Sequence, residues 1–382
     1  MSGIWLLWVG SVVVTVALGI AAGAYSRGMG WPSTPLFPFF SWDYGWYEGI
    51  ALHGYPDLVG RRYAFFPLWP WLIRASGSVP DWQFAGAATV AASALAFFGV
   101  AAGSPARRPV SAALALACWP GSFALLLAYP DGLALAAAAW AAALTLRGLP
   151  LAAAPVAAVA ALARPNGFLI ALPLALLARG RDGSYKLAAA APVLAAAAVE
   201  GFFWARSGKA SAFYDAQRSW GRKGPSGVGN WLGHVRDLIA AHPSLVPLLV
   251  VAAAVIVLAW RRFGLWPTLV FGYLCAVPLL LAATQSLHGF VDTGRALLVL
   301  PLLVVLWRLG PRYRPWAAYA TAVVVLLLAS GLMASFGRQS LFAFPIFWAI
   351  GEGPRCLRYP PLAVLGFAAN LGLALLLTRF AP

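Results

Sequence analysis

The sequence predicts an all-α, polytopic membrane protein with about twelve transmembrane helices, some of them broken. The first observation is composition, since 62% of the residues are hydrophobic and only 10% are charged. The second is a mean hydropathy of +0.80, a value typical of chains that cross a bilayer many times. The third is that apolar runs recur along the whole chain and leave no soluble domain, so residues 1–382 are expected to form a single integral membrane domain.

The first apolar run, Ile4 to Ala24, has twenty-one residues. At ~1.5 Å per residue it is long enough for ~30 Å of hydrocarbon. A signal peptide is the alternative, but the run lacks a basic segment before it and is too long, so an uncleaved span is expected. Further spans are expected near residues 84–103, 110–128, 131–147, 151–163, 168–178, 187–205, 245–260, 268–283, 296–307, 317–334 and 361–378.

The net charge of +16 could suggest nucleic-acid binding, but the positions of the basic residues along the chain argue against that role. With the N-terminus inside, basic residues gather in the short cytoplasmic loops and at the C-terminal end, the positive-inside pattern. We therefore expect both termini in the cytoplasm. The excess of Arg over Lys and the Ala-rich spans indicate a GC-rich, bacterial genome, so we expect the protein in the inner membrane. The residues concerned are Arg107, Arg108, Arg147, Arg179, Arg181, Lys186, Arg261, Arg262, Arg308, Arg312, Arg314 and Arg379.

Carboxylates are expected on the opposite side, where three long loops (25–83, 206–244 and 335–360) are also predicted. The first of these should contain interfacial helices. Nine of the eleven carboxylates fall outside or at the outer boundary: Asp43, Glu48, Asp57, Asp81, Asp131, Asp215, Asp237, Asp292 and Glu352.

The runs 151–163 and 168–178 are each too short to cross comfortably. They fit broken or tilted helices around the breaker Arg164-Pro165-Asn166-Gly167 at membrane depth. If they formed one span, every later loop would move to the opposite side of the membrane, and the later basic residues would no longer follow the positive-inside pattern. We therefore keep them as two segments.

The sequence contains none of the common motifs for zinc binding, metalloprotease activity or nucleotide binding. The three cysteines are isolated, the histidines form no HExxH, and there is no Walker sequence or GxGxxG. No haem, metal cluster or cofactor is therefore expected, and dependence on a divalent metal stays open.

The segment Ser41 to Pro56, SWDYGWYEGIALHGYP, is too polar to span a bilayer and too aromatic for a solvated linker. Its apolar positions recur at helical spacing, which predicts an interfacial helix with Ser41 as N-cap. Asp43 either caps this helix or acts as a base. Glu48 lies roughly 140° around the helix from Asp43, which disfavours a two-carboxylate site. His53 lies roughly 15 Å along the helix, which disfavours an Asp–His dyad.

A lone carboxylate suits glycosyl transfer from a lipid phosphate. The reaction needs one base to take the proton of the acceptor hydroxyl, while the phosphate already leaves readily. It also needs a cation or hydrogen-bond donors for the departing phosphate.

The segments WDYGWYEGIALHGYP and RRYAFFPLWPWLIR resemble the PIG-V-type mannosyltransferase family and its bacterial relatives. WPGSFALLLAYPDGLALA, ARPNGFL and DTGRALLVLPLL resemble further segments of that family, so the resemblance covers roughly residues 41 to 303. It implies a GT-C-type multi-helix bundle, a polyprenyl-phosphate mannose donor, and an essential external Asp, here Asp43. Two departures are Asp131-Gly132 in place of a Glu-Ser pair, and Pro165 in place of a Ser.

The expected reaction is inverting transfer of mannose from polyprenyl-phosphate mannose to a lipid-linked or surface glycan acceptor on the external face. Asp43 is the expected general base. Each of these residues also has a purely structural alternative: Asp131 as a helix cap, Arg164 and Asn166 as parts of a turn, and Arg295 as the ion-pair partner of Asp292. Donor or acceptor contacts are expected from Trp42, His53, Tyr129, Asp131, Arg164, Asn166, Gln285, His288 and Arg295.

Two other function classes stay open. A secondary transporter would also have about twelve helices with broken segments, but it should show an internal repeat, and no second copy of the Trp-Asp block is present. A lipid flippase or scaffold subunit would explain the apolar bulk without explaining the polar residues of the external side.

Overall fold

The computed structural model describes residues 43–56, 60–77, 81–117, 121–221, 302–330 and 336–352, with isolated residues elsewhere. Over these residues the secondary structure consists of helices and turns. In chain order the elements are α2 (Tyr44–His53), η2 (Arg61–Ala64), α3 (Leu68–Ala75), α4 (Asp81–Ala102), α5 (Pro109–Ala117), η3 (Ser122–Leu125), α6 (Asp131–Leu146), α7 (Pro150–Ala163), η4 (Pro165–Ile170), α8 (Ala171–Leu177), α9 (Gly183–Ser207), α10 (Ala212–Ser219), η6 (Pro311–Tyr313), α15 (Arg314–Ser330), α16 (Phe336–Gln339), η8 (Ser340–Ala343) and α17 (Pro345–Gly351), where η marks a 3₁₀ helix.

Three helices in the described part are long and apolar enough to cross a membrane: 83–102, 183–207 and 311–330. The helical class predicted from composition is therefore confirmed, whereas the count of twelve spans is not established. The predicted spans 4–24, 245–260, 268–283 and 361–378 lie outside the described residues apart from isolated positions.

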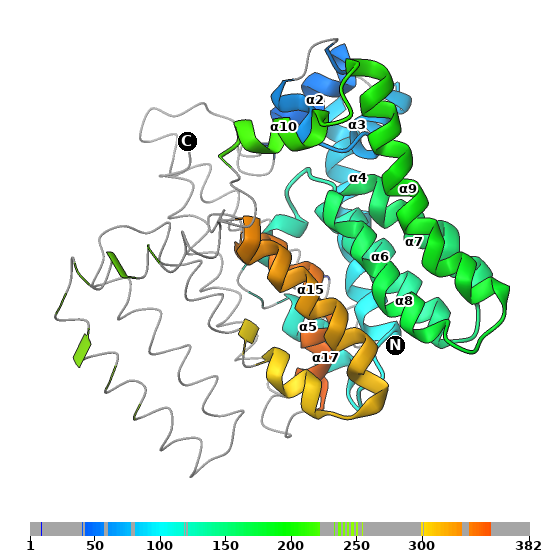
Figure 1. Cartoon of the computed structure of the whole chain (residues 1–382), viewed down its shortest axis with the longest axis vertical. Coiled ribbons are helices and arrows are strands. Elements are labelled where there is room, and N and C mark those ends of the chain that lie inside the picture. Colours follow the sequence, from blue (N-terminus) through cyan, green and yellow to red (C-terminus); the bar gives the residue numbers. More distant parts are fainter. Residues whose placement is uncertain are drawn as a thin grey trace.

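Helices α4, α6, α7 and α9 form the main bundle, in which α6 packs against both α4 and α7, and α7 packs against α9 (Figure 1). Small residues bring α4 and α6 close, as where Gly99 lies against the ring of Trp140. The Trp140 indole donates to the Leu95 carbonyl at 2.9 Å, and Gly132 lies against Ala92. Later residues of α4 contact later residues of α6, so the two helices run in the same direction. The start of α6 is therefore level with the middle of α4, about 16 Å from the start of α4 at ~1.5 Å per residue.

The predicted span 110–128 is wrong as a single helix. Helix α5 ends at Ala117, and the chain then runs through the short helix η3 to the start of α6. The cause is local, because Trp119-Pro120-Gly121 interrupts the helix and Gly121 has a φ of +117°, a conformation that L side chains rarely adopt.

The predicted break after residue 163 is present. Helix α7 ends at Ala163, and Arg164 is extended (φ −145°, ψ 144°), the conformation favoured before a proline. The chain then folds back through η4, and Gly167 lies so close to Ala160 that a Cβ would overlap its carbonyl oxygen. Helix α8 continues and packs against α9. The two runs are therefore separate segments, as the sequence predicts.

Helices α2, α3 and α10 lie together at one end of the bundle, at the top of Figure 1. An aromatic cluster joins them to α9, with Phe203 of α9 packing against Tyr55, Tyr63 and Phe66. Arg206 at the end of α9 donates to the Tyr55 carbonyl at 3.2 Å. The segment that carries Asp43 is thus fixed to the bundle by packing.

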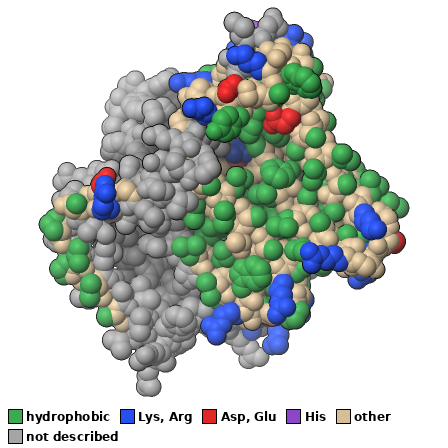
Figure 2. Space-filling model, viewed as in Figure 1, with side chains coloured by type: hydrophobic (Ala, Val, Ile, Leu, Met, Phe, Trp, Pro, Cys, Tyr) green, Lys and Arg blue, Asp and Glu red, His purple; other side chains and the backbone are tan. Residues whose placement is uncertain are grey.

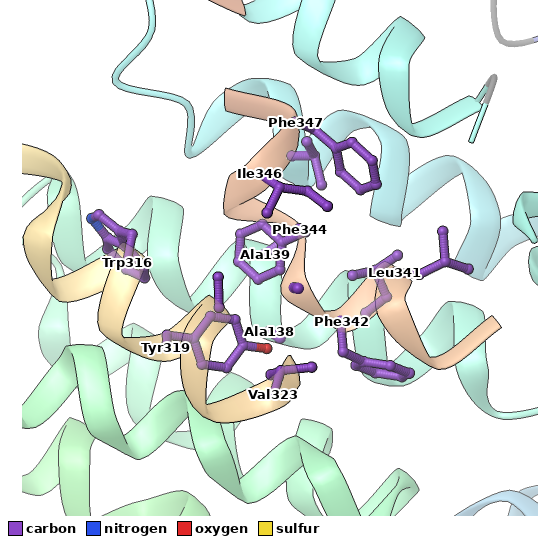
Figure 3. Packing of buried hydrophobic residues seen from close by; sticks show 14 of the residues in the cluster. Ala138, Ala139, Trp316, Tyr319, Val323, Leu341, Phe342, Phe344, Ile346 and Phe347 are labelled. Atoms are coloured by element: carbon purple, nitrogen blue, oxygen red, sulfur yellow. The ribbon is translucent and has the colours of Figure 1, made fainter. Parts of the chain in front are cut away.

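The predicted external loop 335–360 is wrong over its described part. Residues 336–351 form α16, η8 and α17, and Leu341 to Ala349 are almost entirely buried. Figure 3 shows Phe344 and Ile346 among Ala139 of α6 and Trp316 and Tyr319 of α15. The segment reads FGRQSLFAFPIFWAIG, and its apolar and aromatic side chains are stabilised by burial against these helices.

Glu352, at the end of this segment, accepts hydrogen bonds from Arg312 Nη2 at 2.7 Å and from Tyr313 Oη at 2.6 Å. It also lies 3.7 Å from Arg107 Nε. We call Glu352, Arg107, Arg312 and Tyr313 the Glu352 cluster. The sequence placed Glu352 on the opposite side of the membrane from both arginines, and this expectation is wrong because the three side chains are in contact.

The described surface is mainly hydrophobic around its middle, with Lys and Arg side chains along the lower edge and again near the top (Figure 2). Arg147 follows the last residue of α6 and donates to the carbonyl of Ala102, the last residue of α4, at 3.4 Å. The two helix ends that carry predicted cytoplasmic arginines therefore lie side by side.

Candidate active site

Two aspartates and two arginines from four distant segments form one chain of ion pairs. Arg338 Nη1 lies 2.7 Å from Asp43 Oδ2, and Arg338 Nε lies 3.7 Å from Asp131 Oδ1. Asp131 Oδ2 in turn accepts from Arg164 Nη1 at 2.9 Å. We call these four residues the aspartate cluster. Their formal charges balance.

Asp43 occupies the N-cap position of α2, but its side chain makes no capping hydrogen bond. The helix therefore begins two residues later than a Ser41 cap predicts, and the alternative that Asp43 only caps it is wrong. Its backbone N–H donates to Tyr129 Oη at 3.0 Å, which ties the start of α2 to the segment before α6. The carboxylate of Asp43 is therefore available to pair with Arg338. It is 24% exposed, the most open member of the cluster.

Asp131 is the first residue of α6 and its carboxylate is fully buried. It makes no side-chain capping bond, because Pro130 holds the N-cap position. Both of its described partners are arginines. A carboxylate in this position is stable only when cations compensate its lost hydration. The proposed role of Asp131 as a mere helix cap is therefore wrong.

Arg164 lies at the α7–η4 break, and its side chain is only 9% exposed. The extended backbone before Pro165 directs it away from the axis of α7 and toward the start of α6. Its neighbour Asn166 is also buried, at 5% exposure. The sequence predicted that both residues sit at a functional break, and the structure brings Arg164 to the aspartate cluster, with Asn166 buried two residues further along the chain.

Arg338 is the member that the sequence interpretation missed, because it was assigned to a long solvated loop. It lies on α16, and its guanidinium is 5.2 Å from the ring centroid of Tyr129. The backbone of α16 is in close contact with Gly121, where a Cβ would overlap the Gly337 carbonyl. One signal could have identified Arg338: it is the only charged residue in the apolar run 336–351.

Burial disfavours the charge of Arg338 and lowers its pKa, but the attraction of Asp43 and Asp131 outweighs this and raises the pKa above its ordinary value. The guanidinium is therefore permanently charged. Burial, together with the charge of Asp43, raises the pKa of Tyr129 well above its ordinary value. Tyr129 therefore stays protonated across the usable pH range.

Several buried polar atoms of this cluster, and of Asn166 two residues after Arg164, have no hydrogen-bond partner among the described residues. They are Asn166 Nδ2 and Oδ1, Asp131 Oδ1, Arg164 Nε and Arg338 Nε. Buried polar atoms are normally hydrogen-bonded, and leaving one unpaired costs about 1–3 kcal/mol. A group of such atoms at one place is typical of a site that binds a polar ligand or ordered water.

Asp43 was predicted to be a lone carboxylate. This holds for its own helix, since Glu48 accepts a long hydrogen bond of 3.4 Å from Tyr44 and His53 is an exposed residue in the last turn. It does not hold for the folded chain, because Asp131 shares Arg338 with Asp43. Trp42, Gln285, His288 and Arg295 lie outside the described residues.

Within the described part of the chain, no group of three or more His, Cys, Asp or Glu side chains is placed to hold a metal ion. Comparison of the sequence with protein-family models gives no match, and comparison with curated proteins gives none either.

Proposed function

We propose that this protein is a membrane mannosyltransferase that moves mannose from polyprenyl-phosphate mannose to a lipid-linked or surface glycan acceptor, with inversion. One observation carries the proposal. The residues selected from three separate sequence blocks, namely Asp43, Tyr129 with Asp131, and Arg164, meet at one buried polar cluster, and the buried Asn166 follows Arg164 by two residues. Residues chosen only for burial would have no reason to converge on unpartnered donors and acceptors.

In this reaction Asp43 accepts the proton of the acceptor hydroxyl while that oxygen attacks the anomeric carbon. The bond between the anomeric carbon and the phosphate oxygen breaks, and polyprenyl phosphate leaves with the electron pair. Asp43 suits the role of base because it is the most open member of the aspartate cluster, at 24% exposure, whereas Asp131 is fully buried. Tyr129 holds the backbone at Asp43 and so fixes where the carboxylate is presented.

Asn166 and Arg164 supply the donors for the sugar hydroxyls. The amide of Asn166 offers both a donor and an acceptor, and neither has a partner in the described part. Asp131 holds Arg164 through Nη1 and leaves Nε available. Trp42, His53, Gln285, His288 and Arg295 remain proposed contacts on sequence grounds, with Arg295 directed to the phosphate.

A proton-coupled secondary transporter is the second candidate. The observation that favours it is the pair of carboxylates Asp43 and Asp131 on either side of Arg338, since buried carboxylates also serve as proton relays in membrane proteins. Such a relay would move protons without any sugar being transferred, so an assay of covalent transfer separates the two functions.

The test is transfer of radiolabelled mannose from polyprenyl-phosphate mannose by the purified full chain in nanodiscs, with a membrane extract as acceptor source. We expect transfer by the wild type, and a loss of about 10²–10⁴-fold in Asp43→Asn, because an amide cannot accept the proton. Glu48→Gln is the matched control, since it removes a carboxylate from the same helix, and it should transfer normally. Near-normal transfer by a folded Asp43→Asn variant would remove Asp43 from the reaction.

A further inference from the structure

We propose that Arg338 binds the phosphate of the donor, and that Asp43 forms an ion pair with Arg338 when the donor is absent. On this proposal a lipid phosphate takes Arg338 from Asp43 and thereby frees the carboxylate to act as base. The identification of the ligand as a lipid phosphate rests on the proposed function, while the exchange itself rests on the geometry of the cluster.

The position of Arg338 distinguishes it from the other cation of the cluster. Arg164 is only 9% exposed and its Nη1 is held at 2.9 Å by the fully buried Asp131. Arg338 is 16% exposed, and its 2.7 Å partner is Asp43, the most open of the four residues. A ligand that approaches the cluster from its open side therefore meets the pair Asp43–Arg338 before the pair Asp131–Arg164.

The guanidinium of Arg338 is only partly used by its partners. Its Nη1 donates to Asp43 at 2.7 Å, but its Nε has no hydrogen-bond partner in the described part and is 3.7 Å from Asp131. A planar guanidinium binds phosphate best through two parallel N–H groups. While the Arg338 guanidinium turns toward a phosphate, Asp131 would remain close enough to stabilise its positive charge. The exchange therefore leaves Arg338 with a counter-ion throughout.

Charge balance makes Asp43 and the phosphate competitors. Within the aspartate cluster, two aspartates and two arginines are neutral together, so a phosphodiester donor adds a negative charge beside Asp43 that these four described residues do not balance. The least costly response is for Arg338 to bind the phosphate and for Asp43 to leave the ion pair.

This exchange also fits the reaction. One carboxylate oxygen of Asp43 is engaged by Arg338 while the pair is formed, and its release makes that lone pair available to the acceptor hydroxyl. When the proton arrives at Asp43 the carboxyl becomes neutral, and the departing phosphate monoester gains the negative charge. Arg338 is then placed at the group on which charge develops.

The experiment measures binding of radiolabelled polyprenyl phosphate to the full chain in nanodiscs, without turnover. We expect Asp43→Asn to bind about tenfold more tightly than the wild type, because the competitor for Arg338 is gone. Arg338→Gln should bind at least about tenfold more weakly, and the double variant should bind as weakly as Arg338→Gln. Glu48→Gln, which removes a negative charge from the same helix, should bind as the wild type does.

The double variant decides the proposal. If Asp43→Asn tightens binding equally in the Arg338→Gln background, the effect is a general change of charge and the exchange is refuted. Arg338→Lys keeps the charge but loses the fork, so it should bind between Arg338→Gln and the wild type, and it serves if Arg338→Gln fails to fold. Competition by phosphatidylglycerol in the nanodisc as effective as that by unlabelled polyprenyl phosphate would also overturn the proposal, because the site would then be a general headgroup site.

The two proposals can fail separately. Absence of mannose transfer by the wild type, with the binding pattern intact, would refute the proposed function and leave the exchange at Arg338 standing. Normal transfer with a binding pattern that ignores Arg338 would refute the exchange alone.

Discussion

The same short stretch of chain, residues 338–352, contributes to two charged clusters that differ in how their polar atoms are satisfied. In the Glu352 cluster one carboxylate accepts hydrogen bonds from Arg312, Tyr313 and the backbone N–H of Arg107. Its arginines are 57% and 87% exposed, so water completes their hydration. In the aspartate cluster the arginines are 16% and 9% exposed, and several polar atoms have no described partner.

The difference indicates different roles. A saturated carboxylate with solvated cations stabilises only modestly, and it can anchor the end of α17 without binding anything else. A buried cluster with unused donors and acceptors is costly unless a ligand or water completes it. Position in the fold, and not residue type, therefore separates the anchor from the candidate active site.

The largest test of this comparison is a pair of isosteric neutral substitutions, Asp131→Asn and Glu352→Gln. Asp131→Asn leaves two poorly hydrated arginines with less counter-charge, and we expect it to lower the free energy of unfolding by about 3–5 kcal/mol. Glu352→Gln keeps an acceptor for Tyr313 beside solvated arginines and should cost about 1 kcal/mol or less. Denaturant or thermal unfolding in detergent measures both.

Equal losses in the two variants would contradict the distinction. If Asp131→Asn proves too unstable to purify while Glu352→Gln behaves as the wild type, the sign and order of the prediction are upheld.

A second test asks whether Arg338 depends on the contact between Gly121 and Gly337. Both Gly121 (φ +117°) and Gly208 (φ +69°) have backbone angles that disfavour alanine, but only Gly121 faces another backbone, since nothing lies within 4 Å of a Cβ at Gly208. Gly208→Ala should therefore cost about 1 kcal/mol through strain alone. Gly121→Ala should cost a further ~1–3 kcal/mol through overpacking, and it should also reduce mannose transfer because α16 moves.

Transfer assays and unfolding measurements on the two glycine variants check this prediction. Normal transfer by Gly121→Ala would show that the position of Arg338 does not depend on this contact.

The substitutions expected to change stability least are cysteines that test which side of the membrane each loop faces. Single cysteines replace Ser104 and Ser184, beside the basic ends of α4 and α9, and Ser211 at the start of α10, after Cys118, Cys275 and Cys356 have been replaced. In intact cells an impermeant thiol reagent should label only the variant Ser211→Cys. Labelling of Ser184→Cys from outside would contradict the expected cytoplasmic placement of the loop between α8 and α9.

The sequence by itself determined the helical membrane class, the break at Arg164, and most members of the candidate site. These features depend on local chemistry that needs no partner. Long apolar runs form helices inside a bilayer because every backbone polar group must be satisfied within the segment, and Pro165 disfavours the helical conformation at Arg164, which is extended. Charged or amide side chains at a helix break inside an apolar chain are rare enough to indicate a site.

Only the tertiary structure decided which charges meet. Residues Asp43 and Arg338 are 295 positions apart in the chain, and no periodicity relates them. Arg338 was misassigned because a segment of 335–360 looks like a loop when its length and its Gly, Pro and Arg residues are considered alone. Packing against α15, α6 and α5 buries it instead, and this burial turns an apparently solvated arginine into the partner of the candidate base. Ion pairing is a through-space property, so it becomes visible only when distant helices are placed side by side.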